Sequence, residues 1–140
     1  MNMAHTTTTI KISASPDQVW KLIGGFNSLP DWLPSISSSK LSEGGRVRHL
    51  ADLNGEVIVE RLEVFNDKER YYTYSIMKAP FSVTDYQATI HVREIADSKT
   101  SLVEWSGSFT PVDISDEEAI NLFHGLYEDG LKALGQAFTN

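Results

Sequence analysis

The clearest pattern in the sequence is a long amphipathic stretch near its C-terminal end. Residues 115–118, Ser-Asp-Glu-Glu, form a capping box with three acidic residues in the first turn, where the helix dipole favours negative charge. Apolar residues then recur at helical spacing, at Ile120, Phe123, Tyr127, Leu131, Leu134 and Phe138. The pattern predicts one long helix whose apolar stripe lies across a sheet.

Three glycines interrupt this predicted helix, namely Gly125, Gly130 and Gly135. Glycine inside a helix costs about 1 kcal/mol relative to alanine, so some feature of the fold should compensate. Three explanations remain open. The helix backbone approaches the sheet closely at these positions, the glycines are tolerated on the exposed side, or they leave room for a bound molecule.

Two shorter helical signals lie near the N-terminus. Ser15, Pro16 and Gln18 supply an N-cap, a proline suited to the first helical position and a capping-box partner. The apolar face of this helix consists of Val19, Trp20, Leu22 and Ile23. A second box at residues 28–31 predicts a further helical turn that carries Trp32. We expect Trp20 in the core, whereas Trp32 could pack, line a pocket mouth or face a partner.

Strand-like alternation fills the middle of the sequence. Ile10 and Ile12 mark a first strand, and the β-prone threonines of 6–9 are interpreted as its lead-in. Turn sequences such as Asn54-Gly55 separate the later strands, which we predict at 36–41, 46–50, 56–65, 71–77, 86–95 and 101–109. The expected architecture is α+β, with one antiparallel sheet of about seven strands in a single domain over residues 1–140.

Alternation within the strands predicts which side chains face inward. In 86–92, the inner face carries Tyr86, Ala88, Ile90 and Val92. In the strand at 56–65, Ile58, Leu62 and Val64 share a face with the single charge Glu60, whereas Val57 and Val59 share theirs with two charges, Arg61 and Glu63. We therefore predict Glu60 inside, where a carboxylate requires a partner, a proton, water or a polar ligand group. In 101–109, apolarity alone turns Glu104 outward.

Composition limits the function classes. The 140 residues are 41% apolar and carry a net charge of −7 without any basic block, which argues against nucleic acid as a partner. The absence of cysteine excludes disulfides and thiolate metal sites. No apolar stretch approaches the roughly 20 residues of a membrane span, and the start of the chain lacks a signal-peptide core, so we expect a cytoplasmic protein.

The sequence lacks motifs for metal binding, covalent catalysis and nucleotide cofactors. The four histidines have no metal-ligand spacing, so no metal is predicted. There is no nucleophile elbow, phosphate-binding glycine loop or dinucleotide fingerprint, so no cofactor is predicted either. What remains is a candidate acid/base set of Glu60, Tyr86 and Glu104 in an apolar setting. A water-filled structural network is the simpler interpretation of these groups.

The order of these elements resembles the START-like (SRPBCC) polyketide cyclase/dehydrase family, whose relatives include Bet v 1, MxaD-like proteins and the plant abscisic acid receptors. The resemblance covers nearly the whole chain and implies a helix-grip fold, in which a curved sheet wraps around the C-terminal helix and encloses a cavity. By position, it implies that Glu60, Tyr86 and Glu104 contribute polar groups to that cavity. The lysine with which the receptors bind the hormone carboxylate is absent from residues 33–36, so the resemblance does not extend to that hormone.

Two loops match the gate and latch of the receptors by position, residues 51–55 with Leu53 and residues 78–81 with Phe81. They are equally well explained as ordinary hairpin connections. The resulting candidate ligand-binding set is Trp32, Leu53, Ile58, Glu60, Tyr74, Ile76, Phe81, Tyr86, Ala88, Glu104, Ser106, Phe123, Tyr127 and Leu131.

Three functions are consistent with this sequence. The leading hypothesis is the binding of a hydrophobic small molecule, such as a lipid, a polyketide or a terpenoid-like compound, in an internal cavity. The second is a cofactor-independent cyclase or dehydratase in which Glu60, Tyr86 and Glu104 move protons. The third is an accessory or chaperone-interacting domain, which requires an exposed apolar patch. Homodimerisation through sheet edges or the outer face is left open.

Overall fold

A computed structural model describes residues 3–95 and 97–139 of the chain. Its elements follow the predicted order along the sequence, with bounds β1 (Ala4–Ile12), α1 (Pro16–Ile23), α2 (Leu29–Trp32), β2 (Ile36–Ser42), the 3₁₀ turn η1 (Glu43–Gly45), β3 (Val47–Asp52), β4 (Val57–Asn66), β5 (Tyr71–Lys78), β6 (Val83–Ile95), β7 (Asp97–Pro111) and α3 (Asp116–Ala137).

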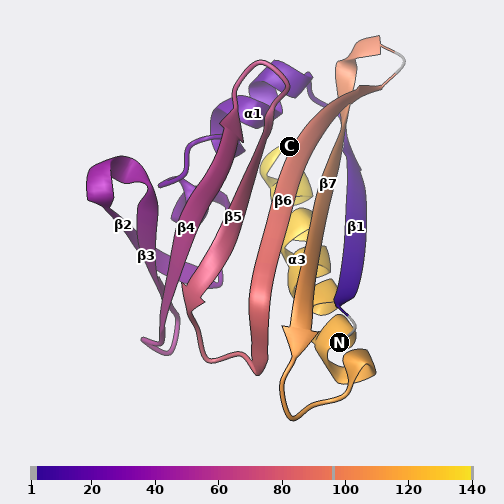
Figure 1. Ribbon diagram of the computed structural model, residues 1–140. Coiled ribbons are helices and arrows are strands. Elements are labelled where there is room, and N and C mark those ends of the chain that lie inside the picture. The colour runs from indigo at the N-terminus through magenta and orange to yellow at the C-terminus, as the bar shows by residue number, and fades with distance from the viewer. Residues whose placement is uncertain (1–2, 96, 140) are drawn as a thin grey trace.

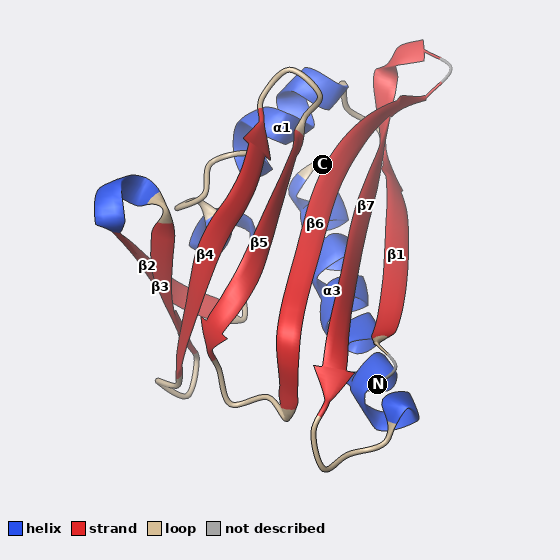
Figure 2. Ribbon diagram, viewed as in Figure 1, coloured by secondary structure: helices blue, strands red, loops and turns tan. Residues whose placement is uncertain are grey.

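The strands form one antiparallel sheet in the order β1-β7-β6-β5-β4-β3-β2. Six of the seven strands follow one another as a meander, and β1 adds to the far edge by pairing with β7. The sheet curves around α3, which runs along its concave face, while α1 lies across one end of the sheet in contact with β6 and β7, and α2 lies against β2 (Figures 1 and 2). This arrangement confirms the predicted α+β helix-grip fold.

The helix starts follow local hydrogen bonding. Ser15 and Gln18 form the predicted capping box, with both reciprocal bonds present. At the start of α3, the Ser115 hydroxyl accepts from the Glu118 amide at 3.0 Å. The predicted box at Ser28 is wrong, because the Ser28 hydroxyl instead donates to the carbonyls of Gly25 and Leu22, at 2.7 and 3.0 Å.

The threonine run is part of β1 itself, not only its lead-in. Thr6 and Thr8 point inward and are buried. Their hydroxyls lie 3.1 and 3.2 Å from Nδ1 of His124 on α3. β-branched threonines suit a strand, and these hydrogen bonds satisfy the two buried hydroxyls.

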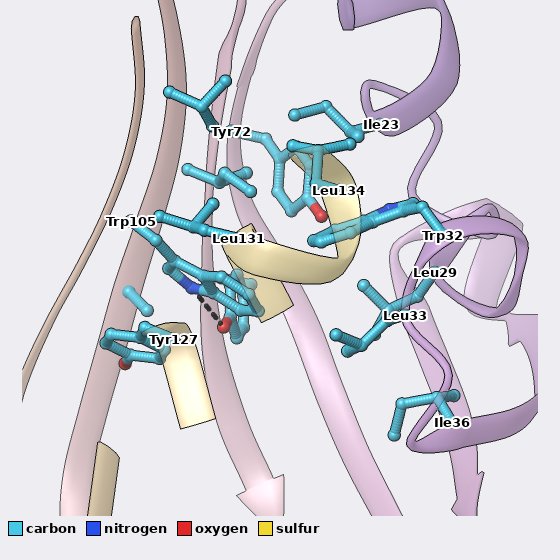
Figure 3. Packing of buried hydrophobic residues seen from close by; sticks show 14 of the residues in the cluster. Ile23, Leu29, Trp32, Leu33, Ile36, Tyr72, Trp105, Tyr127, Leu131 and Leu134 are labelled. Atoms are coloured by element: carbon cyan, nitrogen blue, oxygen red, sulfur yellow. Dashed lines mark hydrogen bonds between the residues drawn. The ribbon is translucent and has the colours of Figure 1, made fainter. Parts of the chain in front are cut away.

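Close approach explains two of the three glycines in α3. A Cβ atom on Gly130 would lie 2.8 Å from the Trp105 ring and 3.0 Å from Leu33, and one on Gly135 would lie 2.9 Å from Ile10. A Cβ atom on Gly125 would meet nothing within 4 Å, so this glycine is simply tolerated. The main core fills the space between α3, α2 and the sheet (Figure 3).

Candidate ligand cavity

A cavity of about 210 Å³ lies between α3 and the concave face of the sheet. Strands β3 to β7 form its floor, α3 covers it, and α2 with the start of β2 closes one side. Most of the lining side chains are apolar or aromatic, and the lining consists of Leu29, Leu33, Ser35, Ile36, Arg48, Leu50, Asp52, Ile58, Glu60, Tyr74, Ile76, Phe81, Tyr86, Trp105, Phe123, Leu126 and Tyr127.

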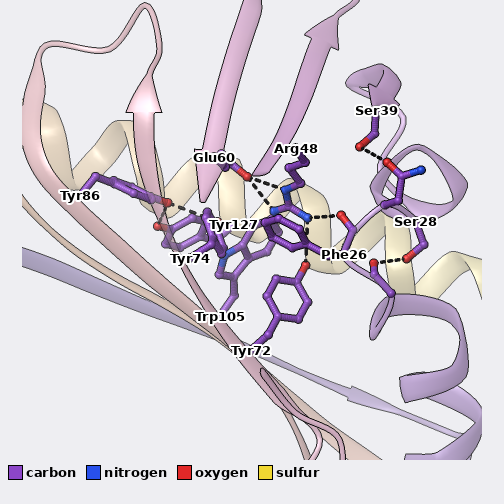
Figure 4. Close-up of polar contacts among 12 residues, drawn as sticks. Phe26, Ser28, Ser39, Arg48, Glu60, Tyr72, Tyr74, Tyr86, Trp105 and Tyr127 are labelled. Atoms are coloured by element: carbon purple, nitrogen blue, oxygen red, sulfur yellow. Dashed lines mark hydrogen bonds and ion pairs between the residues drawn. The ribbon is translucent and has the colours of Figure 1, made fainter. Parts of the chain in front are cut away.

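The polar centre of this cavity is an ion pair between adjacent strands. Arg48 on β3 and Glu60 on β4 are direct cross-strand partners, and both are buried, at 1% and 7% exposure. Arg48 Nε and Nη2 both lie close to Glu60 Oε1, at 2.8 and 2.7 Å. Glu60 therefore faces inward as predicted, and its required partner is the guanidinium of Arg48 (Figure 4).

Arg48 is held on its other sides as well. Its Nη1 donates to the Phe26 carbonyl at 3.0 Å and to the Tyr72 hydroxyl at 3.4 Å. The rings of Phe26, Tyr74 and Tyr72 surround the guanidinium, with centroids 4.2, 5.0 and 5.6 Å away. Cation–π contact and hydrogen bonding together offset the cost of burying this charge.

The second carboxylate oxygen of Glu60 is not engaged in this way. Among the described residues, no hydrogen bond reaches Oε2. Among the described residues, Trp32 Nε1 is the only fully buried side-chain polar atom without a hydrogen-bond partner. Because Oε2 of Glu60 also lacks a partner but is not among these atoms, it keeps some exposed surface. Burial raises the pKa of Glu60, and the Arg48 charge opposes this rise.

Three tyrosine hydroxyls form a second polar group on the cavity wall. Trp105 Nε1 donates to Tyr74 Oη at 3.1 Å, the hydroxyls of Tyr74 and Tyr86 are 3.5 Å apart, and those of Tyr86 and Tyr127 are hydrogen-bonded (Figure 4). Burial raises the pKa of all three tyrosines well above 10, so they stay protonated at neutral pH. Protonated hydroxyls can both donate and accept hydrogen bonds.

A family model described as "Polyketide cyclase / dehydrase and lipid transport" matches residues 3–139 of this chain. The chain belongs to this family. Two solved structures from bacilli are similar over nearly their full length. A protein of unknown function from Bacillus thuringiensis is 73% identical, with a TM-score of 0.96 and coverage of 98% of this chain and 100% of that one. The protein XoxI from Bacillus cereus is 76% identical, with a TM-score of 0.94 and coverage of 96% and 95%.

A more distant solved structure shares the architecture. The Zhui aromatase/cyclase from Streptomyces sp. R1128 is 18% identical to this chain, with a TM-score of 0.74 and coverage of 98% of this chain and 92% of that one. At this identity the likeness concerns the fold alone.

Eight candidate residues named from the sequence line the cavity between α3 and the sheet. They are Ile58, Glu60, Tyr74, Ile76, Phe81, Tyr86, Phe123 and Tyr127. Three others, Trp32, Ala88 and Leu131, are buried in the core but do not line the cavity. Trp32 packs against Trp105, with ring centroids 5.8 Å apart, so its role is packing. Leu53, in the turn after β3, is 73% exposed and lies away from the lining.

Glu104 and Ser106 lie on the opposite face of the sheet. Val103 and Trp105 on β7 point inward, so strand alternation turns their neighbours Glu104 and Ser106 outward. Glu104 accepts a hydrogen bond there from Arg93 at 3.2 Å. This corrects the cavity position that the family resemblance implied for Glu104, and it agrees with the apolar pattern of the strand. The candidate acid/base set is thereby reduced to Glu60 and Tyr86.

Arg48 is the main cavity residue absent from the sequence-based set. A signal for it exists, because Arg48 shares strand parity with Leu50 and both point inward. No group of three or more His, Cys, Asp or Glu residues that could hold a metal ion occurs in residues 3–95 and 97–139. None of the helices described there is long and apolar enough to cross a membrane.

Proposed function

We propose that this protein binds a small hydrophobic molecule in the cavity beneath α3. The observation that carries the proposal is the lining itself, an apolar and aromatic wall with polar groups gathered at Glu60 and at the hydroxyls of Tyr74, Tyr86 and Tyr127. Apolar walls supply affinity through burial, and a few placed polar groups fix the orientation of a ligand. Membership of a family described by cyclase, dehydrase and lipid-transport activities supports this proposal.

Two neighbouring residues on β5 allow a direct test. Ile76 lines the cavity, whereas Met77 points away from it and is 54% exposed. Ile76→Phe fills part of the cavity, and Met77→Phe adds the same ring at the surface. With 2-acetylnaphthalene as a neutral fluorescent probe, we expect Ile76→Phe to weaken binding roughly tenfold or more and Met77→Phe to leave it unchanged. Equal affinity of the two variants would overturn the proposal.

A cyclase or dehydratase reaction is the second candidate function. The observation in its favour is that a carboxylate with a raised pKa and tyrosine O–H groups share one apolar cavity. Such groups can transfer protons to and from a carbonyl substrate. Under this reading Glu60→Gln abolishes turnover of a poly-carbonyl substrate but leaves its affinity within about tenfold. Unchanged turnover in Glu60→Gln would exclude Glu60 as the catalytic acid or base.

A further inference from the structure

The cavity lining has no cation left to pair with an anionic ligand. Arg48 uses Nε and Nη2 on Glu60, and Nη1 on Phe26 and Tyr72. The third charged lining residue, Asp52, is negative and accepts from the backbone amides of Asn54 and Glu56 at 2.8 and 2.9 Å. Four of the five N–H groups of the guanidinium are therefore engaged by protein groups, and its charge is balanced by Glu60. An anionic ligand would meet two carboxylates and no unengaged cation of the lining.

Glu60 offers the cavity a strong acceptor. Its Oε1 receives both Arg48 contacts, and Oε2 receives none from the described residues. The two Arg48 contacts favour the ionised form of Glu60 over the protonated one, and an ionised carboxylate accepts hydrogen bonds and cannot donate them. A ligand group next to Oε2 must therefore be a donor, such as a hydroxyl, to avoid leaving a buried acceptor unpaired.

The tyrosine cluster offers the complementary group. Tyr74, Tyr86 and Tyr127 bring three hydroxyl protons, and Trp105 already occupies an acceptor position on Tyr74. The contacts Tyr74–Tyr86 and Tyr86–Tyr127 each use one hydroxyl proton, whichever way they point. One O–H is therefore left over at this cluster. It is available to an acceptor on the ligand, such as a carbonyl oxygen.

We infer that the ligand of this cavity is an uncharged compound with a hydrogen-bond donor for Glu60 and a carbonyl-type acceptor for the Tyr74–Tyr86–Tyr127 cluster, and that the cavity discriminates against carboxylates. This inference rests on the proposed function and narrows its substrate class. The volume of about 210 Å³ lies below the roughly 300–1,000 Å³ of sites for drug-sized ligands, so the ligand is a small hydroxy-carbonyl compound with a compact apolar body.

A matched series of naphthalenes tests each element of the inference on the unmodified protein. The hydroxy ketone 2-acetyl-6-hydroxynaphthalene has both groups, 2-acetyl-6-methoxynaphthalene lacks the donor, 2-naphthol lacks the acceptor, and 6-hydroxy-2-naphthoate carries a charge. We expect the hydroxy ketone to bind roughly tenfold or more tightly than each of the others, as one buried hydrogen bond or charge allows. Titration calorimetry or probe fluorescence measures the four affinities.

The outcomes separate this inference from the proposed function. Equal affinities across the series, or tightest binding of the carboxylate, would overturn the inference and leave cavity binding standing. Binding of none of the four compounds, nor of 2-acetylnaphthalene, would overturn both.

Two variants test how the charge of Glu60 affects ligand selectivity. Glu60→Gln removes the negative charge that faces the cavity, and we expect it to improve naphthoate binding relative to the hydroxy ketone by about tenfold. Glu63→Gln is the matched control, because Glu63 lies on the same strand but is exposed and accepts from Ser75 at 2.6 Å. It should leave the ratio unchanged. An unchanged ratio in folded Glu60→Gln would contradict the inference, and the series on the unmodified protein decides it if that variant does not fold.

Discussion

Arg48 and Glu60 face each other across β3 and β4, with two nitrogens of one guanidinium within 2.8 Å of a single carboxylate oxygen. Both side chains are buried, so each depends on the other for its charge balance. A buried pair of this kind costs desolvation free energy when it forms. Its loss is more harmful when one partner remains than when both are replaced.

Single and double replacements of this pair should therefore differ in stability. We expect Arg48→Met or Glu60→Met to lower the free energy of unfolding by about 3–5 kcal/mol, because an unpaired charge stays buried. The double variant Arg48→Met/Glu60→Met should lose much less than the sum. Urea denaturation measures all three, and a double variant whose loss equals the sum would show that the two charges are not coupled.

Gly107 and Tyr127 provide a second coupled pair. A Cβ atom on Gly107 would overlap the Tyr127 hydroxyl oxygen, whereas the nearest ring carbon, Cζ, would be 3.1 Å away. We expect Gly107→Ala to destabilise the protein by about 1–3 kcal/mol through overpacking. In a Tyr127→Phe background the same change should cost less than about 1 kcal/mol. A thermodynamic cycle from denaturant unfolding checks this, and additive effects would contradict the described contact.

Two glycines of α3 should respond in opposite directions to alanine. Gly125 has open space where a Cβ would be, so Gly125→Ala should raise the free energy of unfolding by about 0.4–1 kcal/mol. Gly130→Ala places a methyl group 2.8 Å from the Trp105 ring and should lower stability despite the same gain in helix propensity. Thermal unfolding of the two variants compares them directly. Stabilisation by Gly130→Ala would mean that α3 lies farther from the sheet.

The buried tyrosines predict a steep loss of stability at alkaline pH. Burial raises the pKa of Tyr74, Tyr86 and Tyr127 above the value of about 10 that they have in the unfolded chain. Above pH 10 the folded state holds protons that the unfolded state releases, so stability is complete below pH 10 and falls as pH rises toward the folded-state pKa values.

Stability measured against pH, together with tyrosinate absorbance, tests this expectation. The pH dependence should correspond to as many as three protons, and Tyr127→Phe should reduce it by about one. The tyrosinate signal of these residues should rise only with unfolding. Ionisation of all five tyrosines near pH 10 in the folded protein would refute the buried position of the cluster.

Strand alternation correctly predicted which side chains face the core over much of the sheet. It placed Tyr86 and Ala88 inside, chose Glu60 as the one inward charge of its strand, and turned Glu104 outward. These inferences succeed because one face of each strand meets a dry core and the other meets solvent. For Glu104 the local pattern was a better guide than positional comparison with distant receptors.

Long-range contacts were harder to predict. Arg48 was missed because a buried arginine is rare and depends on partners such as Glu60 and Phe26, which the sequence separates by many residues. The packing of Trp32 against Trp105 depends on tertiary context in the same way. Ser28 is a local case, since its hydroxyl donates to the carbonyls of Gly25 and Leu22 instead of capping the helix. The cavity itself depends on the curvature of the sheet, which periodicity does not encode.

The pairing of β1 with β7 has a consequence for how the protein folds. Ala4 pairs with Phe109 and Ile12 with Ser101. The first strand of the chain therefore cannot pair with the sheet until the last strand has formed. Contacts this distant in sequence slow folding, whereas the β2-to-β7 meander can pair step by step as the chain emerges from the ribosome. The same β1 strand holds Thr6 and Thr8 against His124 of α3. Synthesis must therefore be nearly complete before the N-terminal edge of the sheet and the helix that covers the cavity can come together.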